Sequence, residues 1–264
     1  MSVLHRVREE LARRNFAGRR VSLVEGAAVV AGSTLLLVVA GHRREALMIG
    51  GIGALGLVDD LVEPHRRREG GAAAKGLRGH LRALAAGEIT TGALKAFGIP
   101  VIALAGTRSG PGPVGMRLLD GALVAGSANL VNLLDLRPGR ALKAVLPLAG
   151  ALVLIGPRAG EAGDARRTLA GAALLTGLAA LPADLRERGM LGDAGANTLG
   201  ALLGASAAQA LPVPARFGTL GVVAGLTLAS ERISFSRVIE SQPLLRRLDG
   251  LGRRPLPPAD VSAP

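Results

Sequence analysis

Eight uncharged apolar stretches divide the 264-residue chain, and they constrain its fold more than any other feature. Only one of them reaches the roughly 20 residues that cross a bilayer comfortably, and several of the others would suit a buried helix of a water-soluble protein. These stretches are apolar on every side, however, whereas a surface helix of a soluble protein keeps a polar outer face. We therefore predict an all-α, polytopic transmembrane bundle of about eight spans, over residues 26–41, 46–58, 96–107, 121–134, 144–157, 168–183, 194–215 and 217–230.

The composition supports this class of protein. The apolar residues are mostly Ala, Leu, Val and Gly, with 38 glycines, four phenylalanines and no Trp or Tyr. Small residues let helices approach closely, which matters most where lipid supplies no hydrophobic drive for association. The net charge of +12 is typical of nucleic-acid-binding proteins, but here arginines separate apolar runs and aromatic residues are nearly absent. We therefore expect a membrane partner and no nucleic acid; with no cysteine, redox chemistry does not indicate a compartment.

The distribution of Lys and Arg predicts the orientation. With the N-terminus inside, 23 of the 32 basic residues fall in inside segments and eight in outside connections, while Lys95 lies within a span. This bias follows the positive-inside rule. We predict one transmembrane catalytic domain with cytoplasmic loops over residues 1–240, and a cytoplasmic, partly disordered, proline-rich tail over residues 241–264.

Four aspartates lie at the inside ends of three different spans: Asp59 and Asp60, Asp135, and Asp193. Because Lys and Arg alone set the orientation, this convergence is an independent observation. Carboxylate oxygens are hard ligands that suit Mg²⁺, which often bridges protein carboxylates and substrate phosphates. The alternatives stay open: the acidic pair can be a solvated helix end near Arg66–Arg68, and Asp193 can be a helix N-cap.

Two asparagines precede one of these aspartates at intervals of three residues. Asn129, Asn132 and Asp135 therefore rise along nearly one helix face. Such polar groups are costly within an apolar run unless they meet partners, and we favour a ligand over hydrogen bonds between helices. Lys75, His80 and Lys95 could bind phosphates facing the acidic site, although Lys95 could also extend towards the interface instead.

Three motifs in this order, GLVDD, NLVNLLD and MLGDAG, resemble those of the polyprenyl-phosphate N-acetylhexosamine-1-phosphate transferases. That family includes phospho-MurNAc-pentapeptide translocase and the UDP-GlcNAc:undecaprenyl-phosphate enzymes, and the resemblance covers about residues 15–250. It implies Mg²⁺-dependent transfer of a sugar 1-phosphate from a UDP-sugar to a polyprenyl phosphate, with release of UMP, at the cytoplasmic face of the bacterial cytoplasmic membrane during cell-envelope synthesis. The implied catalytic residues are Asp59, Asp60 and Asp135, the metal ligands Asp193 and Asp60, and the substrate-binding residues Lys75, His80, Lys95, Asn129 and Asn132.

The sequence departs from the family at several points. In the family, a second aspartate often stands three residues after the one that matches Asp135, but here that position is Pro138. The family's histidine-rich loop is also missing, because the only histidines are His5, His42, His65 and His80. The family commonly has ten or eleven spans. One rival hypothesis is a catalytically altered relative that binds polyprenyl phosphate as a regulator or scaffold. A transporter would place ionisable groups near mid-membrane and often show a repeat, neither of which the sequence has; a homodimer is left open.

Overall fold

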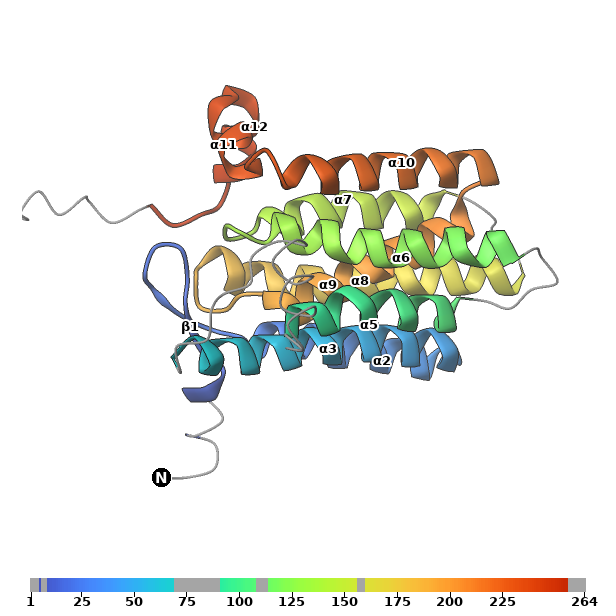
Figure 1. Ribbon diagram of the computed structural model, residues 1–264, viewed down its shortest axis with the longest axis horizontal. Coiled ribbons are helices and arrows are strands. Elements are labelled where there is room, and N and C mark those ends of the chain that lie inside the picture. The colour runs from blue at the N-terminus through green and yellow to red at the C-terminus, as the bar shows by residue number, and fades with distance from the viewer. Residues whose placement is uncertain (1–4, 6–8, 69–90, 108–113, 156–159, 256–264) are drawn as a thin grey trace, which may run out of the picture.

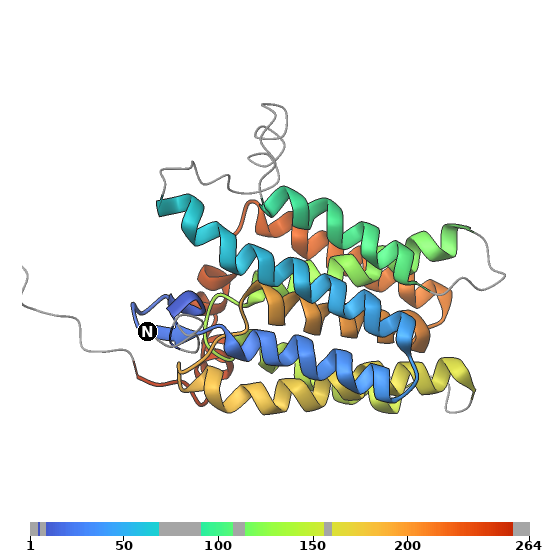
Figure 2. The same cartoon turned by 90° about the horizontal axis from the view of Figure 1, so that it is seen from below.

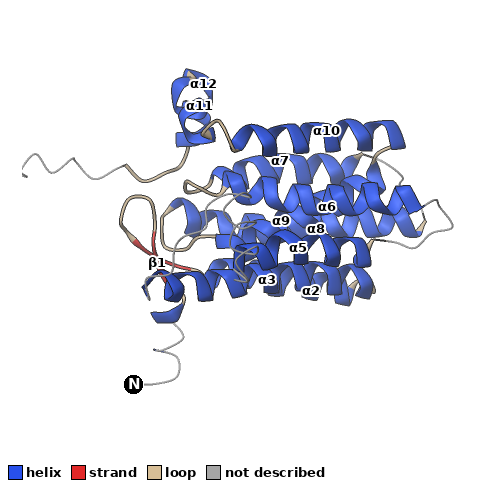
Figure 3. Ribbon diagram, viewed as in Figure 1, coloured by secondary structure: helices blue, strands red, loops and turns tan. Residues whose placement is uncertain are grey.

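The computed structural model describes His5 and residues 9–68, 91–107, 114–155 and 160–255. Over these residues the protein is helical apart from one small hairpin, which confirms the all-α prediction (Figure 3). Eight long helices follow each other up and down along one axis (Figures 1 and 2). They are α2 (Val24–Val39), α3 (Arg43–Arg68), α5 (Thr91–Gly106), α6 (Val114–Leu134), α7 (Arg140–Leu154), α8 (Glu161–Leu185), α9 (Gly192–Ala210) and α10 (Val213–Ser230).

Two pairs of smaller elements lie at one end of the bundle. Strands β1 (Ala12–Arg14) and β2 (Arg20–Ser22) pair antiparallel. Helices α11 (Phe235–Ser241) and α12 (Pro243–Gly250) follow α10 at the same end (Figure 1). We call this the site end. The tail that we expected to be partly disordered thus begins with the helix α12, and residues 256–264 lie outside the described part of the chain.

Three of the described helices are long and apolar enough to cross a membrane: Val114–Leu134, Gly163–Leu185 and Val213–Ser230. Helices α2 and α5 are also apolar but shorter. Large apolar side chains are exposed around the bundle, including Val39, Leu47, Val101, Leu175 and Leu228. Apolar surface on this scale favours a lipid environment over water. The total of about eight spans stays a prediction.

Helix α9 is the centre of the bundle rather than one of those three candidates. It corresponds to residues 194–215, the stretch whose length alone most favoured a span, but 17 of its 19 residues are buried by other helices. Its small residues allow this position: a Cβ added at Gly200 or Gly204 would lie 2.3 or 2.6 Å from a backbone oxygen of α6. Close contact with α6 therefore depends on glycine.

Candidate functional site

Three acidic side chains and one lysine meet at the site end of the bundle. Asp59 and Asp60 come from α3, Lys95 from α5 and Asp193 from the first turn of α9. The Lys95 Nζ lies 2.5 Å from Asp59 Oδ2 and also forms an ion pair with Asp193 Oδ2. One ammonium thus joins carboxylates from two different helices. We call these four residues the carboxylate cluster.

Asp60 plays a different part in this cluster from its neighbour. Its two carboxylate oxygens accept hydrogen bonds from the backbone N–H groups of Asp193 at 3.0 Å and Ala194 at 2.9 Å. These N–H groups belong to the first turn of α9, which has no cap from its own preceding side chain, Leu191. A carboxylate there is favoured by the unpaired N–H groups and by the helix dipole. The cap of α9 is therefore supplied by Asp60 from another helix rather than by Asp193.

Two glycines bring α3 and α9 close enough for this contact. Gly56 lies one turn before Asp60, and a Cβ added there would lie 2.5 Å from the backbone oxygen of Asp193. Gly192 has a φ of +58°, and an added Cβ would lie 2.8 Å from Asp60 Oδ2. The first glycine removes a steric clash and the second also permits a left-handed backbone. The GLVDD and LGDAG segments thus fit each other through their glycines as well as their carboxylates.

The carboxylate cluster carries three acidic groups for one lysine, so a further cation would balance it. Carboxylate oxygens are suitable donors for Mg²⁺, and Asp59 and Asp193 already approach one point. The Lys95 ammonium stands at that point. Within the described residues, no group of three or more acidic, histidine or cysteine side chains is arranged to hold a metal. The donors fit the ion in their chemistry, but Lys95 must withdraw before Asp59 and Asp193 can share it.

A cavity of about 350 Å³, lined by charged and apolar side chains, lies at the same end of the bundle. Its wall combines acidic and basic side chains with Phe16, whose ring centroid lies 4.3 Å from the Arg137 guanidinium. Burial raises the pKa of Asp135 well above its ordinary value, and the nearby charge of Asp184 adds to the rise. The charged residues that line the cavity are Arg14, Asp135, Arg137, Asp184 and Glu187.

Asn129 and Asn132 of α6 and Asp135, which directly follows this helix, lie in different environments. Asp135 lines the cavity, whereas Asn129 is exposed and its Nδ2 lies 3.4 Å from Thr227 Oγ1 of α10. Asn129 therefore makes the kind of contact between helices that was the alternative to ligand binding. Asn132 is half-buried between them on the helix and does not line the cavity.

Sequence reasoning missed several polar residues around the cavity. Asp184 accepts a hydrogen bond from the Gly139 N–H at 2.7 Å, and Glu187 accepts one from Asn15 Nδ2 at 2.5 Å. Glu187 also pairs with Arg19. Asp184 had a signal, because it directly follows an apolar stretch at its inside end, as Asp59 and Asp135 do. Asn15, Arg19 and Glu187 had none, because the pairing partners lie more than 160 residues apart.

A second group of ion pairs fixes the C-terminal helices to the bundle. Arg140 donates from Nε to Asp249 Oδ1 at 2.9 Å and from Nη2 to Oδ2 at 3.0 Å, while Arg253 donates to Oδ1 at 2.6 Å. Arg140 also donates to Ser236 Oγ at 2.8 Å, and Lys143 to the Asp249 carbonyl oxygen at 2.6 Å. We call Arg140, Asp249 and Arg253 the arginine clamp. Neither Arg140 nor Asp249 was selected from the sequence.

Burial alone would raise the pKa of Asp249, but the hydrogen bonds and charges of Arg140 and Arg253 outweigh it and hold the pKa below its ordinary value. The clamp also contacts the segment that follows α6, because Arg253 Nε donates to the carbonyl oxygen of the buried Pro138 at 2.8 Å. Pro138 is the position at which the resembling family often has a second aspartate.

Two predicted substrate-binding residues, Lys75 and His80, lie outside the described residues. The remaining predicted residues fall into the carboxylate cluster, the cavity wall and the α6 helix. No model of a known protein family matches the chain, and neither a curated protein nor a solved structure was found to match it.

Proposed function

We propose that this protein is a membrane-embedded phosphotransferase that moves an N-acetylhexosamine 1-phosphate from a UDP-sugar to a polyprenyl phosphate and releases UMP. The observation that carries the proposal is the meeting of Asp59, Asp60 and Asp193 from two helices, at the end of the bundle that also holds the cavity. Phosphoryl transfer relies on positioning and on neutralisation of charge more than on covalent chemistry by the protein. In this proposal the carboxylates position a metal ion, and Arg14 and Arg137 of the cavity wall carry positive charge for the phosphates.

The side chains divide the task in this proposal. Asp59 and Asp193 would hold Mg²⁺, which when bound supplies positive charge to the phosphates. Lys95 leaves the two carboxylates and binds a phosphate oxygen, while Asp60 keeps the start of α9 in place. We assign Asp135 a role in holding or transferring a proton at the cavity wall, where burial raises its pKa above the ordinary aspartate value.

The cavity is the place we assign to the nucleotide part of the donor. Its guanidinium groups suit a diphosphate, and Phe16 supplies an apolar ring beside Arg137. Lys75 and His80 stay predictions as further phosphate-binding residues. We infer that the eight long helices all cross the membrane with the site end in the cytoplasm, as the excess of Lys and Arg there favours.

The test is release of UMP by the purified protein in detergent. It receives undecaprenyl phosphate, Mg²⁺ and either UDP-GlcNAc or UDP-MurNAc-pentapeptide, and Asp59→Asn is measured beside it. UMP that requires lipid, metal and Asp59 supports the transferase and identifies the sugar. No UMP with either donor, from protein shown to be folded, would contradict the proposal for these donors.

A second candidate function is a relative that binds polyprenyl phosphate without catalysis. Lys95 favours it, because a built-in ammonium already neutralises Asp59 and Asp193 where a metal would stand. The buried Pro138 in place of an aspartate points the same way. Electron paramagnetic resonance of Mn²⁺ distinguishes the two: the enzyme should bind the ion in an Asp193-dependent manner, whereas the binding-only relative should bind it only after Lys95→Met.

A further inference from the structure

Helices α11 and α12 form a C-terminal hairpin that projects sideways from the bundle. The eight long helices share one axis, and the hairpin extends beyond α10 across that axis at the site end (Figure 1). No residue of either helix is buried. If the long helices cross a bilayer, this position lies at the level of the bilayer surface rather than within its apolar centre.

Helix α12 is strongly amphipathic. Leu244, Leu248 and Leu251 follow each other at intervals of four and three residues, so they share one face of the helix and its end. Their exposed fractions are 68%, 49% and 60%, and Leu245 beside them is 42% exposed. A water-soluble surface does not usually gather four exposed leucines within eight residues. This leucine face therefore requires a covering partner.

The arginine clamp determines which side of α12 faces the bundle. Asp249 is held by Arg140 and Arg253, and it lies about 100° around the helix from Leu248. The side of α12 that carries Asp249, and Leu245 one turn before it, is thus joined to α7, whereas Leu244, Leu248 and Leu251 are left outside this contact. The orientation of the leucines is a consequence of ion pairing within the protein.

Two properties of the hairpin indicate a lipid partner. Arg246 and Arg247 are exposed on α12 and lie about 160° and 100° around the helix from Leu248. A charged face separate from an apolar face is the pattern of helices that lie on anionic membranes. The hairpin also continues directly from α10, of which only Val223 is buried and which is one of the candidate spans. A helix joined by a short connection to a membrane span reaches the bilayer surface beside that span.

We propose that the C-terminal hairpin is a membrane-surface anchor for anionic phospholipids. The leucine face of α12 enters the boundary between headgroups and acyl chains, and Arg246 and Arg247 bind lipid phosphates. This inference rests on the chain's membrane insertion and not on transferase activity, so either can fail alone.

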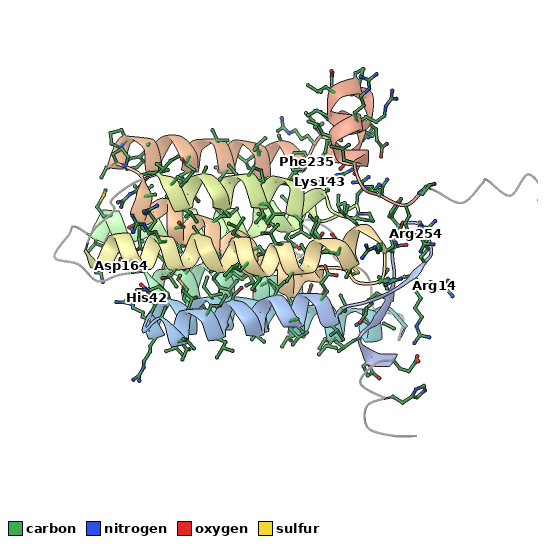
Figure 4. All side chains as sticks on the ribbon, turned by 180° about the vertical axis from the view of Figure 1, so that it is seen from behind. Arg14, His42, Lys143, Asp164, Phe235 and Arg254 are labelled. Atoms are coloured by element: carbon green, nitrogen blue, oxygen red, sulfur yellow. The ribbon has the colours of Figure 1, made fainter. Side chains whose placement is uncertain are left out.

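The absence of Trp from the sequence allows a direct test in the full chain. Leu248→Trp places a single fluorophore on the leucine face, and Arg254→Trp is the control, because Arg254 is exposed at the outer end of the molecule (Figure 4). Both proteins are reconstituted in phosphatidylcholine vesicles with phosphatidylglycerol, with and without lipids brominated near the headgroup. Bromolipid quenching of the Leu248→Trp protein should exceed that of the control about threefold, as expected for an interfacial helix.

Three results would overturn the proposal. The first is iodide quenching of the Leu248→Trp protein equal to that of the control, because the side chain would then lie in water. The second is protection from both iodide and bromolipid, because protein, such as a second copy, would then cover the leucine face. The third is bromolipid quenching of the Leu248→Trp protein that does not depend on charge. Quenching that stays the same after Arg246→Glu/Arg247→Glu, or in vesicles without phosphatidylglycerol, would show that the anionic headgroup has no part in the contact.

A spin label keeps the test informative if Leu248→Trp fails to fold. The chain also lacks cysteine, so Leu244→Cys provides one labelling site on the same face. The label should be more accessible to oxygen than to a water-soluble nickel complex, and the opposite ratio would contradict the anchor.

Discussion

The carboxylate cluster and the arginine clamp lie at the same end of the bundle but differ in their balance of charge. In the cluster, Asp59 and Asp193 share the single ammonium of Lys95, and Asp60 accepts backbone hydrogen bonds from the start of α9. In the clamp, Asp249 alone receives two guanidinium groups, Arg140 and Arg253. The clamp is complete as a structural contact, whereas the cluster keeps an excess of negative charge that a ligand could balance. Acidic groups left without enough partners are the better indicator of a functional site.

The largest effect should come from removing a charge of the cluster. If the proposed transferase is correct, Asp193→Asn should lower UMP release by about 1,000-fold, since a group that positions transition-state charge is lost. The unfolding temperature should stay near that of the parent protein. Asp164→Asn is the control, because Asp164 is exposed at the opposite end of the bundle (Figure 4). Equal activity of the Asp193→Asn and Asp164→Asn proteins would show that Asp193 is not part of the active site. The cluster would then differ less from the clamp than we infer.

The clamp should show the opposite pattern, with a loss of stability. Arg140→Met leaves Asp249 without its two-point partner, and the two side chains of this pair are only 5% and 9% exposed. We therefore expect the free energy of unfolding to fall by about 3 kcal/mol, as when one partner of a largely enclosed ion pair is removed. Unfolding monitored by circular dichroism in detergent gives the value. Arg186→Met, at an exposed position of the same end, should change it little. Similar values for both variants would show that the clamp does not stabilise the fold.

A smaller effect should follow from widening the contact between α3 and α9. Gly56→Ala places a Cβ against the backbone of Asp193, so we expect about 2 kcal/mol of destabilisation from overpacking. Gly150→Ala introduces the same methyl group in α7, where no atom lies within 4 Å of the added Cβ. The destabilisation by Gly56→Ala minus that by Gly150→Ala gives the energetic cost of the steric clash between α3 and α9. Equal effects of the two substitutions would mean that the helices can move apart without loss of stability.

The smallest effect should be the pH dependence of the clamp. The pKa of Asp249 is lower in the folded protein than in the unfolded chain, so its stabilisation is present above the ordinary aspartate pKa and is lost as the pH falls through the folded value. Comparison of the parent with Asp249→Asn between pH 7 and pH 3 checks this. The stability difference should stay constant down to about pH 5 and shrink below about pH 4. If the stability difference between the parent protein and Asp249→Asn instead grew as the pH fell, the prediction would be wrong.

Local patterns in the sequence were sufficient to predict the helical class and much of the carboxylate cluster. Apolar stretches without polar faces predicted the bundle, and the positions of Asp59, Asp60 and Asp193 at the inside ends of stretches predicted their shared end. Both inferences rest on the pattern of apolar and charged residues along the chain, and such a pattern involves only residues that are close in sequence. The number of spans and the catalytic roles stay predictions.

Only the tertiary structure determined which groups pair. Lys95 lies between Asp59 and Asp193, and Asp60 accepts hydrogen bonds from the first turn of α9. Asn129 contacts α10, whereas Asp135 faces the cavity with Asp184. The clamp joins Arg140 to Asp249 across 109 residues. A sequence records which polar groups need partners, but the partner depends on how closely glycine-lined helices pack, because ion pairs and hydrogen bonds act over only a few ångströms.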